Sequence, residues 1–178
     1  ARPDEDRAAA MYELAEELLA GAGYFHYEIS NWATLGHGAV SAGSRWWPEH
    51  IASRSGPERS EAVSPYVCRH NLTYWRNQPW LGVGAGAHSW MPVEVLSGTS
   101  HALREAAGGE RWANVGHPRD YLVAVVEETS SASWRHGIEE IDRATEMGET
   151  MMLGLRLAEG VRVERFEDRF DLRLTDAF

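Results

Sequence analysis

The chain is poor in several residue types, and each shortage argues against certain classes of protein or partner. Among 178 residues there is one cysteine, Cys68, so no disulfide can form within the chain, which suits a cytoplasmic protein. All 17 basic residues are arginine, and the net charge of −10 argues against nucleic acid as the main partner. No apolar run approaches the roughly 20 residues of a transmembrane segment. The first residues do not resemble a secretory signal. We therefore expect a globular cytoplasmic protein.

The most informative stretch is residues 68–90, CRHNLTYWRNQPWLGVGAGAHSW. Its first part supplies an imidazole, an amide, a phenol and an indole within six positions: His70, Asn71, Tyr74 and Trp75. This set suits a flat, partly polar ligand such as a porphyrin. Residues 81–89 read as a strand whose glycines let a ligand approach the main chain. The alternatives are that His70 caps a turn and that His88 is a core histidine whose hydrogen bonds are satisfied.

Apolar spacing predicts helices and strands along the rest of the chain. One helix precedes Gly21 and Gly23, and acidic residues stand at its start. The other predicted helices begin at Pro118, with a buried stripe of Tyr121, Leu122, Val125 and Val126, run from Ile141 to Leu155, and span Val163 to Phe170. Strands are predicted at residues 24–31, by alternation, and at 111–115.

Several motifs resemble those of the HemW family, and they follow one another in the family's order. They are YEISNWA at 27–33, GH at 36–37, RHNLTYWR at 69–76, LGVGAGAHS at 81–89 and ETMMLGLRL at 149–157. HemW proteins are radical-SAM relatives of oxygen-independent coproporphyrinogen III oxidase and are regarded as haem chaperones. The chain therefore resembles part of a haem chaperone, one that binds haem and delivers it to acceptor proteins.

The resemblance implies an α/β fold in two incomplete parts. Residues 1–90 are expected to be the end of a radical-SAM partial barrel, with an insertion at 38–67 that the family lacks. The insertion is rich in Ser, Arg, Gly, Glu and Pro, and we expect it to be disordered or loosely packed. Residues 91–178 are expected to be a connection and the start of a mainly helical HemW/HemN-type C-terminal domain. The chain thus reads as a fragment open at both ends.

The resemblance also suggests roles for particular residues. His70 is the expected axial ligand of haem iron, with His88 and then Cys68 as weaker candidates, and Arg69 or Arg76 is expected to meet a propionate. Near the S-adenosylmethionine pocket, the resemblance suggests contacts from Gly84, Gly86, Ala87 and His88. At the reactive end of the barrel it suggests Glu28 and Ser30. The alternative for Glu28 is a solvated charge at a strand edge.

Two other functions stay open at this point. One is the oxidase reaction itself, the radical decarboxylation of coproporphyrinogen III in porphyrin biosynthesis. The other is a structural or interaction fragment without a ligand. S-adenosylmethionine and a [4Fe-4S] cluster are expected only in a full-length protein. The exposed edge of an incomplete barrel leads us to expect self-association of this chain.

We predict that this chain alone has no radical-SAM activity, because a [4Fe-4S] cluster needs several thiolates and Cys68 is the only one. Anaerobic iron–sulfur reconstitution should leave it without a stoichiometric cluster spectrum. A stable cluster that cleaves S-adenosylmethionine would contradict this prediction.

Overall fold

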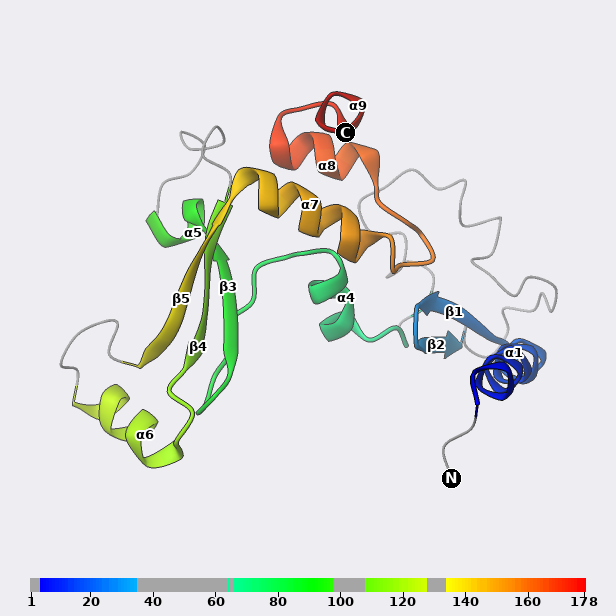
Figure 1. Cartoon of the computed structure of the whole chain (residues 1–178), viewed down its shortest axis with the longest axis horizontal. Helices are drawn as coiled ribbons and strands as arrows, with labels where there is room; N and C mark the ends of the chain where they lie inside the picture. The colour runs from blue at the N-terminus through cyan, green and yellow to red at the C-terminus, as the bar shows by residue number, and fades with distance from the viewer. Residues whose placement is uncertain (1–3, 35–63, 65, 98–107, 128–133) are drawn as a thin grey trace. The chain divides into compact units, whose positions relative to one another are not determined.

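A computed structural model of the chain describes residues 4–34, 64, 66–97, 108–127 and 134–178 (Figure 1). The insertion predicted at 38–67 lies almost wholly outside the described residues. Two compact units are present: Ala1–Leu72 with Leu155–Gly160, and Thr73–Gly154 with Val161–Phe178. Both helices and strands occur, so the predicted α/β class is confirmed. The proposed division near residue 90 stays a prediction.

The first unit begins with a long helix, α1 (Glu5–Gly21). Asp4 caps it, because its side chain accepts a hydrogen bond of 2.8 Å from the Arg7 amide. Glu5 and Asp6 follow in the first turn, where the helix dipole favours acidic side chains. The predicted helix is confirmed, but α1 buries none of its residues, and Leu18 on its apolar stripe is 64% exposed.

A hairpin follows α1 in the same unit. β1 (Tyr24–Glu28) pairs antiparallel with β2 (Asn31–Thr34), so the strand predicted over 24–31 is cut short by a turn at 29–30. The prediction of one apolar and one polar face is also only half right. Phe25 and Tyr27 are buried, but so are His26 and Glu28 on the other face. His26 stacks on Trp32 with ring centroids 4.6 Å apart, which covers one face of its imidazole ring.

The second unit contains an antiparallel sheet in the order β3-β4-β5. Its strands are β3 (His88–Pro92), β4 (Gly108–Asn114) and β5 (Arg135–Asp142), with α5 (Val93–Ser97) and α6 (Pro118–Val126) in the connections. β4 confirms the predicted strand at 111–115 and extends it towards the N-terminus. Because neighbouring strands run in opposite directions, α5 and α6 leave the sheet at opposite ends (Figure 1).

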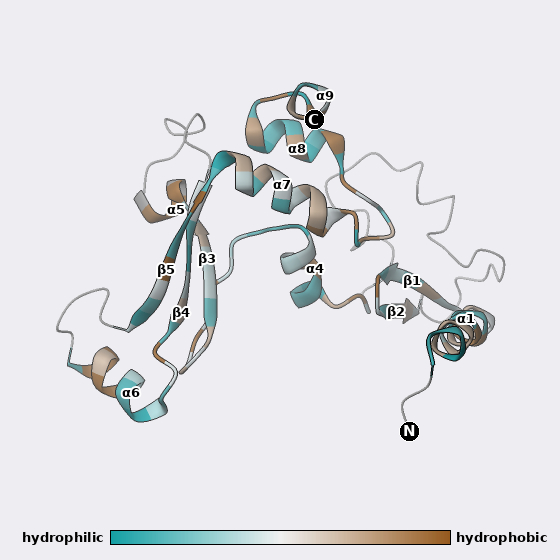
Figure 2. Cartoon of the chain, viewed as in Figure 1, coloured by the Kyte–Doolittle hydropathy of each residue, from teal (hydrophilic) through white to brown (hydrophobic). Residues whose placement is uncertain are grey.

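Helix α6 begins at Pro118 as predicted, but its apolar stripe is not buried. Leu122 is 61% exposed and Val126 75% exposed, while Tyr121 is half-buried. Figure 2 shows hydrophobic colouring along part of α6. Periodicity reveals an apolar face but not what covers it, so the prediction of a buried stripe is wrong for these residues.

Three helices complete the second unit: α7 (Arg143–Gly154), α8 (Val163–Phe170) and α9 (Leu174–Ala177). The helix predicted from Ile141 starts later, because Ile141 belongs to β5, where it is buried. Asp142 accepts a 2.8 Å hydrogen bond from the Thr145 amide, which lowers the pKa of Asp142 and starts α7. Helix α8 is confirmed, with Phe166 and Phe170 buried.

Each unit has its own apolar centre. In the first unit the buried hydrophobic residues are Phe25, Tyr27, Ala33, Val67, Leu72 and Leu157. In the second they are Trp90, Trp112, Ile141, Phe166 and Phe170. Within the described ranges, no helix is both long and apolar enough to cross a lipid bilayer.

We predict that Phe170→Ala lowers the free energy of unfolding by about 3–5 kcal/mol, because the ring is fully buried and its removal leaves a cavity. Urea unfolding followed by circular dichroism measures the change. Val126→Ala, at an exposed position, is the matched control and should stay within about 0.5 kcal/mol of wild type. Equal effects of the two substitutions would contradict the assignment of the core.

Candidate functional site

The histidine motif forms a short helix, α4 (Arg69–Trp75). Residues four apart lie on the same side of a helix, so His70 shares a side with Tyr74, and Asn71 shares one with Trp75. Leu72 is the buried residue of α4, whereas His70 is exposed and Tyr74 and Trp75 are half-buried. His70 is thus part of a helix.

The start of α4 is held by a buried tyrosine of β1. The Cys68 amide donates a 3.2 Å hydrogen bond to the Tyr27 hydroxyl. Burial raises the pKa of the Tyr27 phenol, so the hydroxyl keeps its proton at physiological pH. Cys68 itself is exposed and is a free thiol.

The end of α4 is fixed by Asn77. This residue has a left-handed backbone conformation, with φ of 48°, and its amide donates to the Tyr74 carbonyl at 2.9 Å. Asn77 is only 1% exposed. Its side-chain amide donates to the hydroxyl of Thr150 on α7 at 3.1 Å. A helix end of this type satisfies carbonyls that would otherwise lack donors.

Aromatic rings connect Tyr74, in the part of α4 that belongs to the second unit, to the sheet of that unit. Tyr74 meets Trp80 edge to face, with ring centroids 4.8 Å apart. Trp80 stacks on Trp90 of β3 at 6.1 Å, and the two residues exchange backbone hydrogen bonds of 3.0 and 2.9 Å. Trp90 is fully buried. The aromatic end of the motif is therefore packed against a rigid part of the second unit.

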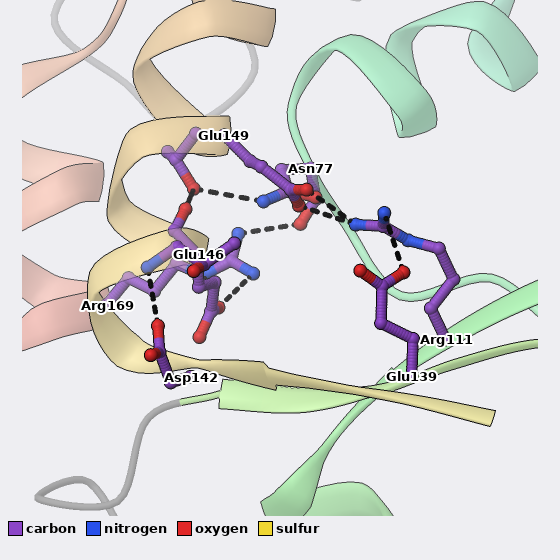
Figure 3. A network of polar contacts seen from close by, with 9 residues as sticks. Asn77, Arg111, Glu139, Asp142, Glu146, Glu149 and Arg169 are labelled. Carbon is purple, nitrogen blue, oxygen red and sulfur yellow. Dashed lines mark hydrogen bonds and ion pairs between the residues drawn. The ribbon is translucent and has the colours of Figure 1, made fainter.

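A network of charged residues lies beside this aromatic row (Figure 3). Arg169 of α8 donates from Nε to Oε1 of Glu146 on α7 at 2.8 Å, and from Nη1 to the Asn77 carbonyl at 2.7 Å. Arg111 of β4 donates to both carboxylate oxygens of Glu149 at 2.7 Å. Sequence reasoning did not find these residues, because nothing in their local pattern separates them from ordinary surface charges on a helix.

The glycine run is a loop, and the prediction of a strand over 81–89 is wrong before His88. Gly84 and Gly86 have φ of 103° and 71°, values that favour glycine and interrupt a strand. Buried Asn114 organises the loop by donating to the carbonyls of Gly82 and Gly84 at 3.1 and 2.7 Å. β3 then begins at His88, which is exposed, so the interpretation of His88 as a core histidine is also wrong.

Most amides of this loop already have partners in the protein. Gly82 donates to the Ser89 hydroxyl, Gly84 to the Tyr121 hydroxyl, Gly86 to the Val115 carbonyl and Ala87 to the Gly84 carbonyl. A ligand would therefore have to contact the loop through its remaining polar groups or its Cα surface.

Glu28 and Ser30 lie together at the hairpin turn of the first unit. The Glu28 carboxylate accepts hydrogen bonds from the Ser30 amide at 3.2 Å and from the Asn31 side-chain amide. Glu28 is only 1% exposed, so the interpretation of a solvated edge charge is wrong. Its backbone also bridges to Leu157. Ser30 is exposed at the turn.

Among the described residues, no group of three or more His, Cys, Asp and Glu side chains is arranged to hold a metal ion. A haem iron differs from such a site, because the porphyrin supplies four ligands and the protein can supply one imidazole. His70, exposed on α4, has the access that such a ligand needs.

Comparison with known proteins first identifies a domain. Residues 141–178 match the family model described as the HemN C-terminal domain. This range begins at the end of β5 and takes in α7, α8 and α9, so it contains Glu146, Thr150 and Arg169. The chain thus carries at least part of a HemN-type C-terminal domain. No solved structure matches the chain.

The curated relatives identify the family. The chain is 30% identical over 168 residues to the heme chaperone HemW of Lactococcus lactis subsp. lactis (strain IL1403), a match covering 94% of this chain and 31% of that protein. It is 27% identical over 176 residues to the heme chaperone HemW of Bacillus subtilis (strain 168), covering 99% and 34%. The chain thus spans about a third of the length of these relatives. The resemblance to the HemW family is confirmed.

A mouse relative has a different name. The chain is 34% identical over 104 residues to radical S-adenosyl methionine domain-containing protein 1, mitochondrial, of Mus musculus, a match covering 58% of this chain and 16% of that protein.

We predict that Gly82→Ala destabilises the second unit by about 1–3 kcal/mol, because an added Cβ would lie 2.1 Å from the His88 carbonyl oxygen. Gly116→Ala is the matched control, since a Cβ there meets nothing within 4 Å. Thermal unfolding of the two variants measures the difference. Equal melting temperatures would show that the loop does not pack on β3 as described.

Proposed function

We propose that the chain is the C-terminal part of a HemW-like haem chaperone, which binds haem and delivers it to acceptor proteins. The observation that carries this proposal is the arrangement of α4, where exposed His70 shares a helix side with Tyr74. The relatives named heme chaperone HemW, matched over more than nine-tenths of this chain, support it.

In this proposal His70 is the axial ligand of the haem iron. A neutral imidazole is a common haem ligand, and an exposed one can be reached without unfolding the helix. Tyr74, one turn further along, and Trp75 supply aromatic surface for the porphyrin ring. Asn71 provides an amide for hydrogen bonding, and Arg69 or Arg76 pairs with a propionate.

His88 and Cys68 are the other candidates for iron ligation, since both are exposed. They rank below His70 because neither lies on the helix that carries the aromatic residues. Cys68 would bind the iron as a thiolate. His88 lies next to the glycine loop.

The remaining site residues belong to a radical-SAM domain in the full-length protein. There we propose that Gly84, Gly86, Ala87 and His88 contact S-adenosylmethionine. The tight turn of this loop, in which Gly84 and Gly86 have positive φ, supports close approach of a ligand. A [4Fe-4S] cluster would be held by cysteines outside this chain, because Cys68 is alone.

Glu28 and Ser30 are proposed to lie at the reactive end of the partial barrel, with residues 1–90 as its end and 91–178 leading into the helical domain. The name of the mouse relative supports a radical-SAM domain in proteins of this type. In this arrangement buried Glu28 holds the turn in shape, and exposed Ser30 is the residue that a ligand could reach.

The setting of the proposed chaperone is the cytoplasm, with haem and haem-accepting proteins as its partners. Self-association of this chain by itself is also proposed. It is supported by the exposed apolar side chains of α1 and α6, among them Leu18 and Val126. The names of the relatives favour the chaperone over the coproporphyrinogen oxidase and over a fragment without a ligand.

We predict that His70→Ala in the full-length protein weakens haem binding about tenfold or more, equivalent to ~1.4 kcal/mol, and shifts the Soret band. The physical reason is the loss of the bond between iron and imidazole. Titration with haem, followed by absorption spectroscopy, measures both changes.

The matched control is His136→Ala, which removes another exposed histidine, on β5. Its haem affinity and spectrum should equal those of wild type. If His70→Ala instead binds haem with an unchanged spectrum and affinity, α4 is not the haem site.

A further inference from the structure

Arg169 is the residue through which α7, α8 and the end of α4 are joined. Its Nε and Nη2 atoms approach Oε1 of Glu146 at 2.8 and 2.5 Å, and its Nη1 donates to the Asn77 carbonyl at 2.7 Å (Figure 3). A planar guanidinium can hold a carboxylate and a carbonyl at once, because its donors diverge in a fixed fork. Lysine has no such geometry.

Burial of the Glu146 carboxylate strongly favours its ion pair with Arg169. The Glu146 side chain is 2% exposed, and a buried carboxylate is strongly disfavoured without a cation and hydrogen-bond donors. Arg169, at 24% side-chain exposure, supplies both. The guanidinium therefore pairs with Glu146 and meets the Asn77 carbonyl at the same time.

Asn77 links the Arg169 guanidinium to the end of α4. It is the left-handed residue just past the helix, and its amide bonds back to Tyr74. Its side chain donates to Thr150, whose hydroxyl in turn donates to the Glu146 carbonyl at 2.8 Å. Both the backbone and the side chain of Asn77 are thus tied to one turn of α7.

A second contact of Arg169 reaches the same end of the motif through aromatic rings. Its guanidinium carbon lies 5.3 Å from the centroid of Trp90, within the range of cation–π attraction. Trp90 stacks on Trp80, and Trp80 meets Tyr74 edge to face. Two independent routes, one polar and one aromatic, therefore join Arg169 to Tyr74.

We propose that Arg169 is a positioning residue for the aromatic end of the haem motif, holding Tyr74 in the orientation in which it meets the porphyrin. The inference rests on the proposed haem site on α4 and extends it to a residue nearly 100 positions away in sequence. It makes the HemN-type C-terminal region part of the haem site without contact between Arg169 and haem.

The test uses two variants of the full-length protein that lack the guanidinium. Arg169→Gln removes the guanidinium, with its charge and its forked donors, and keeps Glu146. The double variant Arg169→Met with Glu146→Leu removes both charges and fills their space with apolar side chains, a replacement that commonly preserves stability. Arg173→Gln is the matched control, because Arg173 forms an exposed ion pair with Asp176.

Haem titration is the first readout. Each folded variant without the guanidinium should bind haem about threefold to tenfold more weakly and with a changed Soret band, whereas Arg173→Gln should match wild type. A purely structural role predicts instead that the double variant, once stable, binds haem normally. A folded variant of either kind with wild-type affinity and spectrum overturns the inference.

Hydrogen exchange is the second readout and does not depend on haem. In wild type the amides of Asn77 and Gln78 should be protected as strongly as those of α8, and folded variants should lose protection there. Wild-type protection at 77–78 far below that of α8 overturns the inference even if no variant folds. If wild type binds no haem, the proposed function fails, and the exchange data still decide whether Arg169 positions α4.

Discussion

The ion pair between Arg169 and Glu146 is the interaction on which the second unit depends. The Arg169 guanidinium supplies a cation to the buried Glu146 carboxylate and also donates a hydrogen bond to the Asn77 carbonyl. The start of α7, the end of α8 and the end of α4 therefore all meet at the Arg169 guanidinium. Buried Trp90 lies against the same guanidinium, and this contact joins Arg169 to β3 of the sheet. These contacts hold the end of α4, a helix of seven residues, in position.

Much of the fold followed from the sequence where local patterns decide the structure. α1 and α8 were predicted from apolar spacing, and the start of α6 from Pro118. β5 was missed because most of its residues are exposed, so it has no alternation to reveal it, and Ile141 was assigned to the following helix. The glycine run was misread because the positive φ of Gly84 is invisible in the sequence.

The site divides in the same way. His70, Tyr74 and Trp75 were found because unusual residue types stand close together in the sequence. The helix α4 that brings them to neighbouring positions was not predicted. Arg169 and Glu146 were missed because their importance arises from contacts with distant residues. The alternation in β1 correctly set Glu28 apart from the apolar face. It could not show that the turn would bury this carboxylate under its own hydrogen bonds.

We propose that the full-length protein holds haem on α4, with the HemN-type region as its support. A structure of the haem-loaded, full-length protein tests this claim most directly. We predict iron bound to the imidazole of His70, with Tyr74 against the porphyrin and Arg169 still joined to Glu146 and Asn77. Iron bound to His88 or Cys68, or haem seated away from α4, would contradict it.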